Sequence, residues 1–265
     1  MAIRLTPTVK WIMIACLAGF LVQQTVDQFM GGNLISWLGL VPSQFMIHQR
    51  FWQLFTYPFL HADVTHLLMN MIMLLFFGSE LESVWGRSFF LKFYFLCAVT
   101  SGVVYLLLQA FVWGGEGLGT PMVGASGAIF GLLMAYGLIF GERTMLLMML
   151  IPMKAKYITW IFAGVQLMTV VFSGRNGLSG AAHLTGMITG FVFLWVRAAL
   201  AVMKKKNPGK GFGGLNLPKF GKKKSASQAK GHLRLVIDND SAKKEGYPTV
   251  KVEADDDDSD PKTWH

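Results

Sequence analysis

Long runs of apolar residues, separated by short polar segments, occupy the first 200 positions of this chain of 265 residues. A helix needs about 20 apolar residues to cross the hydrocarbon core of a bilayer. The pattern predicts six spanning helices, at residues 10–28, 67–81, 89–113, 126–140, 156–172 and 180–199. We therefore expect an all-α membrane protein in which residues 1–200 form one domain, a bundle of six transmembrane helices.

Two of these runs, residues 67–81 and 126–140, are short for a membrane crossing. Such helices are expected to begin below the membrane surface, beside a cavity lined by protein or water. The first run follows Arg4 and Lys10, as the apolar part of a signal peptide would. Gln23 and Gln24 stand where a cleavage site needs small residues, so we expect this helix to be retained.

Positive charges indicate how the bundle is oriented, because Lys and Arg gather in cytoplasmic loops. One set of segments carries most of them: Arg4 and Lys10; Arg87 and Lys92; Arg143, Lys154 and Lys156; Arg197 and Lys204–Lys206. The alternate segments carry only Arg50 and Arg175. This bias predicts that both termini are cytoplasmic, which agrees with an even number of helices. The loops at 29–66, 114–125 and 173–179 then face outward.

The charged residues are concentrated in the last quarter of the chain. Residues 1–200 hold 10 Lys and Arg and 6 Asp and Glu, whereas residues 201–265 hold 14 and 9. The net charge of +9 therefore does not indicate a nucleic-acid partner. We expect residues 201–265 to be a cytoplasmic tail, first basic and then acidic, that is mostly disordered. Short strands are predicted at 232–237 and 249–252.

The tail lysines next to the last helix can hold anionic lipid headgroups, and a cytoplasmic partner of the tail is a further possibility. The two cysteines, Cys16 and Cys97, both lie in apolar runs. They indicate neither a disulfide framework nor a metal site. We expect no cofactor.

Ser126 opens the fourth apolar run, in Gly124-Ala125-Ser126-Gly127. A helix N-terminus has unpaired backbone N–H groups and favours negative charge. A serine in this position is either a plain helix cap or a nucleophile. Its partial match to the hydrolase elbow motif does not decide between the two.

His183 lies near the outer start of the sixth run, where it either bonds a backbone carbonyl or acts chemically. Gly186 and Gly190 follow it at G-x-x-x-G spacing, and Gly127 and Gly131 repeat that spacing in the fourth run. Small residues at this spacing let two helices approach closely. If the two faces meet, His183 and Ser126 lie at the same level, and the histidine can accept the serine proton.

His66 and Asn70 share one face of the second helix, because they are four residues apart. Both side chains can donate hydrogen bonds. They are either a pair that joins helices or the donors that stabilise a developing oxyanion.

Together and in this order, these elements resemble the rhomboid family of intramembrane serine proteases. The matching motifs are His66-x-x-x-Asn70, Gly124-x-Ser126-Gly127 and Ala182-His183-x-x-Gly186-x-x-x-Gly190. Residues 51–61, Glu82 and Gly141-Glu142-Arg143 also look like the family, and the resemblance covers about residues 10–197. It implies a rhomboid-like bundle of six helices around a water-filled cavity that opens outward. The compact six-helix core without a cleaved presequence favours the bacterial cytoplasmic membrane. Transmembrane proteins would be the substrates.

The resemblance also implies roles for individual residues. Ser126 would be the nucleophile, and His183 the general base and acid, in a dyad without an acidic third member. The oxyanion hole would consist of His66, Asn70 and the backbone N–H of Ser126. The supporting residues would be Gly124, Gly127, Phe130, Gly186, Gly190 and Glu82, with Glu82 tethering the first outer loop.

The chain departs from the family at two positions. Gln53 follows the tryptophan of the first loop, where the family often has arginine, so the anchoring of that loop to Glu82 is expected to differ. Phe130 stands where some members have a tyrosine under the histidine. Its ring can still stack but has no hydroxyl to donate.

Two other functions compete with proteolysis. A non-catalytic member of the family would bind transmembrane helices, but such relatives typically lack the serine or the histidine. A small transporter would need charges along a pathway or an inverted repeat. The six runs contain few charges and no visible repeat.

Overall fold

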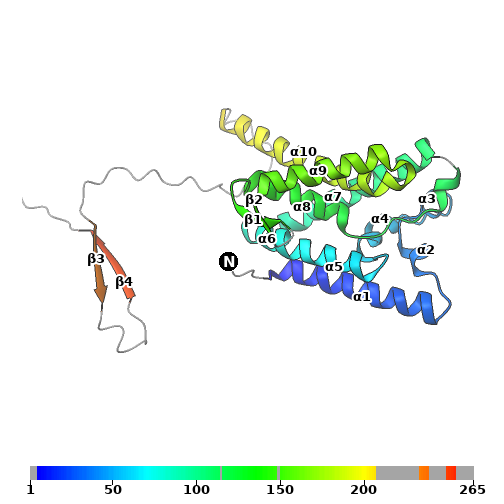
Figure 1. The fold of residues 1–265 in the computed structure, drawn as a ribbon, viewed down its shortest axis with the longest axis horizontal. Helices are drawn as coiled ribbons and strands as arrows, with labels where there is room; N and C mark the ends of the chain where they lie inside the picture. Colours follow the sequence, from blue (N-terminus) through cyan, green and yellow to red (C-terminus); the bar gives the residue numbers. More distant parts are fainter. Residues whose placement is uncertain (1–4, 114, 148–149, 207–232, 239–248, 255–265) are drawn as a thin grey trace, which may run out of the picture. The chain divides into compact units, whose positions relative to one another are not determined.

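The computed structural model describes residues 5–113, 115–147, 150–206, 233–238 and 249–254. The chain divides into two compact units, Met1–Leu217 and Pro218–His265. The first unit is a helical bundle (Figure 1). Its long helices are α1 (Pro7–Phe29), α5 (Val64–Met73), α6 (Ser79–Trp85), α7 (Arg87–Leu108), α8 (Ser126–Ile139), α9 (Ala155–Phe172) and α10 (Leu178–Lys206). The fold class predicted from the sequence, an all-α membrane bundle, is confirmed.

Shorter elements connect these helices. Helices α2 (Leu34–Leu38), α3 (Pro42–Met46) and α4 (Gln53–Thr56) lie between α1 and α5. Strands β1 (Thr144–Leu147) and β2 (Ile151–Lys154) form an antiparallel hairpin between α8 and α9. In the described residues, five stretches are long and apolar enough to cross a membrane: Pro7–Phe29, Val64–Trp85, Arg87–Val112, Ala155–Phe172 and Leu178–Met203. Helix α8 is apolar but shorter.

The second spanning segment is longer than the sequence pattern predicted. Helices α5 and α6 are joined by a π-helical stretch, Leu74–Gly78, into one span of 22 residues. The prediction of a short second helix was therefore wrong. It stopped near Glu80 and Glu82, because charges usually end a membrane run, but both carboxylates have partners that allow the helix to continue. The fourth helix is short, as expected, with 14 residues.

Helix α8 lies at the centre of the bundle. Every residue from Gly127 to Gly137 is buried, and the helix contacts α5, α7, α9 and α10. A helix that is apolar on all sides is stable only when other elements surround it. The enclosed helix carries a polar residue, Ser126, at its N-terminus.

Glu82 does not tether the first outer loop, so that expectation was wrong. Its carboxylate accepts hydrogen bonds from the backbone N–H groups of Thr8 and Val9, both at 3.0 Å, and from the hydroxyl of Thr6. These N–H groups belong to the first turn of α1 and have no partner within that helix. The negative charge also suits a helix N-terminus. Glu82 therefore joins the end of α6 to the start of α1.

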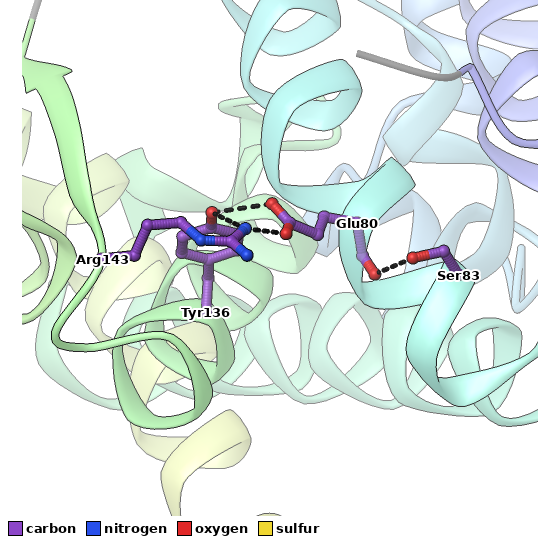
Figure 2. Close-up of polar contacts among 4 residues, drawn as sticks. All are labelled: Glu80, Ser83, Tyr136 and Arg143. Carbon is purple, nitrogen blue, oxygen red and sulfur yellow. Dashed lines mark hydrogen bonds and ion pairs between the residues drawn. The ribbon is translucent and has the colours of Figure 1, made fainter. Parts of the chain in front are cut away.

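A second polar cluster joins α6 to the turn after α8 (Figure 2). Arg143 forms an ion pair with Glu80, and the hydroxyl of Tyr136 donates to the same carboxylate at 2.8 Å. Ser83 donates to the backbone carbonyl of Glu80 at 2.7 Å. The cluster ties together segments that are 56 residues apart in the sequence.

Gln53 anchors the first loop through its own amide. Its Oε1 accepts from the backbone N–H of Val41 at 3.1 Å, and its Nε2 donates to the carbonyl of Ser36 at 2.9 Å. The same loop pairs with the segment before α8, through a bridge between Leu40 and Met122. The two loops predicted to face outward at 29–66 and 114–125 thus lie against each other, as expected for segments on one side of the membrane.

In the second unit, β3 (Leu233–Asp238) pairs antiparallel with β4 (Thr249–Ala254). The two short strands predicted in the tail are confirmed. The disorder predicted for the basic segment, and the acidic run at 255–258, lie outside the described residues. The boundary at residue 200 stays a prediction, and α10 continues beyond it to Lys206.

Candidate active site

Ser126 is the first residue of α8, and its hydroxyl contacts another helix. The N-cap of α8 is Ala125, which has no side-chain cap hydrogen bond. Oγ of Ser126 instead lies 2.7 Å from Nε2 of His183 on α10, 57 positions away in the sequence. The hydroxyl of Ser126 therefore does not act as a helix cap. The backbone N–H of a first-turn residue has no partner within the helix, so it can donate to a ligand.

Close packing of α8 and α10 sets the distance between the serine and the histidine. A Cβ added to Gly186 would overlap the backbone carbonyl of Gly127, and one added to Gly190 would lie 2.8 Å from the carbonyl oxygen of Gly131. Real Cβ atoms essentially never approach other atoms so closely. The two G-x-x-x-G faces therefore meet, and the backbone contact places Ser126 and His183 at the same level.

Phe130 supports the imidazole of His183 from one face. The two rings are nearly parallel, at an interplanar angle of 11°, and their centroids are 4.2 Å apart. Phe130 is one turn after Ser126 on the buried helix α8. The stacking fixes the plane of the imidazole without any hydroxyl from Phe130.

His66 and Asn70 reach the same region from α5, against Gly124. A Cβ added to Gly124 would lie 2.7 Å from Nε2 of His66 and 3.5 Å from Nδ2 of Asn70. Gly124 also has a φ of +109°, a conformation that glycine tolerates and other residues rarely adopt. Both constraints require glycine two residues before Ser126. They bring the donors on α5 to the N-terminus of α8.

The nitrogen Nδ2 of Asn70 is buried and has no hydrogen-bond partner among the described residues. A buried amide donor is costly unless it is paired. The site thus holds a donor that is available to a ligand, beside a hydroxyl that is bonded to an imidazole.

Comparison with known proteins identifies the family. The Rhomboid domain model matches residues 48–200, which include all the residues of this site. The chain belongs to the rhomboid family.

Similar proteins come from plants and bacteria. The mitochondrial RHOMBOID-like protein 12 of Arabidopsis thaliana is 30% identical over 56% of this chain and 46% of its own length. Rhomboid-like protein 19 of the same plant is 28% identical over 72% of this chain and 60% of its own. Rhomboid protease GlpG of Yersinia enterocolitica is 26% identical over 70% of this chain and 61% of its own length. The chain spans about half the length of the relatives it matches first.

Within this rhomboid, the predicted site residues meet at one place, with one exception. His183 contacts both Ser126 and Phe130, and His66 and Asn70 adjoin Gly124. Glu82 lies apart, at the N-terminus of α1. In the described residues, no group of three or more His, Cys, Asp or Glu side chains is arranged to hold a metal ion.

One polar residue beside the histidine was missed in the sequence. Oε1 of Gln166 on α9 lies 2.9 Å from Nδ1 of His183. A polar residue in an apolar helix was the available signal, since such residues usually have a function. The linear sequence does not reveal that Gln166 and His183 share a contact.

A cavity of about 410 Å³ opens between α8 and α9, but it is not this site. Its lining includes Gly137 near the C-terminal end of α8, Glu142 in the turn that follows, and Lys156 at the start of α9. Met134, in the C-terminal half of α8, is the lining residue nearest to Ser126 in the sequence.

Proposed function

We propose that this rhomboid is an intramembrane serine endopeptidase that hydrolyses peptide bonds in or near transmembrane segments of other membrane proteins. The contact between Oγ of Ser126 and Nε2 of His183, at 2.7 Å, carries the proposal. A serine hydroxyl is a weak nucleophile until a base accepts its proton. The family membership supports this chemistry, because relatives such as GlpG are named rhomboid proteases.

In the proposed reaction, Oγ of Ser126 forms a bond to the carbonyl carbon of the scissile peptide, and its proton passes to Nε2 of His183. The C–N bond then breaks, and His183 gives the proton to the leaving amine. An ester on Ser126 remains. A water molecule attacks this ester, and His183 accepts a proton from the water. The new carboxylic acid leaves, and the proton returns to the oxygen of Ser126.

The negative charge that develops on the carbonyl oxygen needs donors that are already in place. His66, Asn70 and the backbone N–H of Ser126 are the groups that we assign to this task. The unpaired Nδ2 of Asn70 supports the assignment, since it has no structural partner among the described residues. Gly124, Gly127, Gly186 and Gly190 act by permitting the close packing, and Phe130 by holding the imidazole plane.

The protein is a multi-pass membrane protein, and its orientation and partners belong to the proposal. The distribution of Lys and Arg supports cytoplasmic termini and an outward-facing site. Substrates would be transmembrane proteins, and the lysines after the last span would meet anionic lipid headgroups. The relatives include a plant mitochondrial protein, so they do not support the expected bacterial inner membrane in particular.

The proposal is tested with a fluorescent fluorophosphonate and a panel of single-span membrane substrates. The parent protein in vesicles should be labelled and should cleave at least one substrate. Ser126→Ala and His183→Ala should lose both, by about 1,000-fold or more, because nucleophile and base act as one unit.

Two matched variants control for general damage. Ser83→Ala removes an exposed hydroxyl on α6, and His48→Ala removes an exposed imidazole in the first loop. Both should keep the parental labelling and cleavage rate. Cleavage that persists in Ser126→Ala would overturn the proposal, as would a parent that binds the substrates and cuts none of them. The second result would favour a non-catalytic protein that binds transmembrane helices.

A further inference from the structure

The imidazole of His183 has a partner at each of its two nitrogens. Nε2 lies 2.7 Å from Oγ of Ser126, and Nδ1 lies 2.9 Å from Oε1 of Gln166. A neutral imidazole carries one N–H and one lone pair. An amide oxygen can only accept, so the contact with Oε1 of Gln166 is a hydrogen bond in the tautomer that carries hydrogen on Nδ1. In that tautomer the lone pair is on Nε2, where the serine proton must go.

The position of Gln166 is fixed by contact between α9 and α10. A Cβ added to Gly180 would lie 2.9 Å from the backbone oxygen of Gln166 and 3.1 Å from Cβ of Thr169. Gly180 precedes His183 by three residues, so the two share a face of α10. The close approach at Gly180 therefore places the amide of Gln166 beside the imidazole. Together with Ser126 and Phe130, Gln166 restrains the ring at both edges and on one face.

The helices that carry Ser126, Gln166 and His183 offer no carboxylate that could orient the imidazole. The described parts of α8, α9 and α10 contain no Asp or Glu, and their basic residues are Lys156, Arg197 and Lys204–Lys206, toward the other end. His66 is the titratable group that reaches the site from α5. Soluble serine proteases use a buried aspartate to orient the imidazole. A neutral amide can hold the same tautomer without placing a charge in the membrane.

We propose that Gln166 is a positioning residue for His183, which it holds in the tautomer with hydrogen on Nδ1. This inference rests on the proposed protease function, and it replaces the expected two-residue dyad by a unit of three side chains. If the amide were reversed, its NH2 group would face Nδ1. The hydrogen of the ring would then be forced onto Nε2, and Ser126 would have no base.

Three variants test the inference in vesicles with a substrate that the parent cleaves. Gln166→Met removes the acceptor but keeps a long, flexible side chain. Its kcat should fall by roughly 10- to 100-fold, a part of what a general base contributes, with KM changed by less than about twofold. Gln166→Glu keeps an acceptor at the same place and should restore much of the activity. Gln28→Met, an exposed amide on α1, is the control and should match the parent.

The pH profile separates positioning from packing. A carboxylate at position 166 would stabilise the charged imidazolium of His183 through its opposite charge. The base of Gln166→Glu would therefore become protonated at a higher pH, and its activity would begin to fall at a higher pH than that of the parent. A merely structural role for Gln166 predicts no shift in this acid limb. Parental kcat in Gln166→Met, or an unshifted profile in Gln166→Glu, would overturn the inference.

The nitrogen-15 spectrum of the imidazole gives a readout that does not need activity. The parent should show the tautomer with hydrogen on Nδ1, and Gln166→Met should lose that preference. If the parent cuts no substrate but shows this change, the protease proposal fails and the positioning by Gln166 stands. If the parent cuts and the tautomer is the same in both proteins, the inference about Gln166 fails alone.

Discussion

Asn70 is the residue whose surroundings best separate a structural from a chemical role. A pair that joins helices needs a partner for each buried donor, yet Nδ2 of Asn70 has none among the described residues. An unpaired buried polar group costs about 1–3 kcal/mol. The buried amide of Gln53, by contrast, bonds to Val41 and Ser36. The first amide fits a donor for a developing oxyanion, and the second fits a structural anchor.

The two amides should therefore respond differently to replacement by leucine. Asn70→Leu should lower kcat by about 100- to 1,000-fold, the usual effect of losing one oxyanion donor. Its Tm should stay the same or rise, because an unpaired polar group is removed. Gln53→Leu should instead lower Tm, since Val41 and Ser36 lose their partner. Thermal unfolding in detergent and single-turnover cleavage measure both effects. A lower Tm with full activity in Asn70→Leu would show that Asn70 joins helices.

At the scale of elements, the contact between α8 and α10 decides whether a site exists. Ser126 and His183 meet only because glycines remove the side chains that would separate the two backbones. The glycines differ in their surroundings, however. An added Cβ at Gly186 overlaps Gly127, whereas one at Gly164 on α9 meets no atom within 4 Å.

Alanine at these two glycines should have opposite effects on stability. Gly186→Ala should destabilise the bundle by about 1–3 kcal/mol through overpacking. It should also lose fluorophosphonate labelling, because α10 moves away from Ser126. Gly164→Ala should stabilise α9 by roughly 0.5–1 kcal/mol and keep the labelling. Unfolding curves and labelling of both variants check this. Equal labelling of the two would refute the idea that the helix contact sets the distance between serine and histidine.

At the scale of the whole molecule, polar ties join distant segments away from the site. The cluster of Glu80, Tyr136 and Arg143 links α6 to the turn after α8 (Figure 2), and Glu82 links α6 to α1. An acidic residue in that turn, Glu142, accepts hydrogen bonds from Lys154 and Lys156 but is exposed. Hydrogen bonds from these lysines lower its pKa to about 2. The charged form of Glu142 thus persists at mildly acidic pH, and its contribution is lost only as the pH falls toward that value.

Replacing Glu80 and Glu142 by glutamine should show which of the two carboxylates stabilises the fold. Glu80→Gln should cost about 1–2 kcal/mol at neutral pH, because Arg143 and Tyr136 lose a partly buried charged partner. Glu142→Gln should leave Tm unchanged, since exposed pairs are screened by water and salt. Thermal unfolding at low and high salt measures the difference. A larger loss of stability in Glu142→Gln than in Glu80→Gln would contradict this account.

The sequence alone determined the membrane class, the six apolar helices and the residues that proved to share a site. These features depend on the pattern of apolar residues and on short motifs, both of which involve residues that are close together in the sequence. The sequence was misleading at Glu82, because a charge at the end of an apolar run shows a need for a partner but not which partner. The sequence did not show that Gln166 contacts His183, and the pattern of apolar residues predicted too early an end for the second helix.

Only the tertiary structure decided which groups touch. The pairing of Ser126 with His183, of His183 with Gln166, and of Glu82 with the start of α1 joins positions far apart in the chain. Such pairs depend on how closely helices pack, and that depends on glycines whose effect appears only when two backbones are placed together. Local pattern therefore specified the elements and the candidate residues, and packing specified the site.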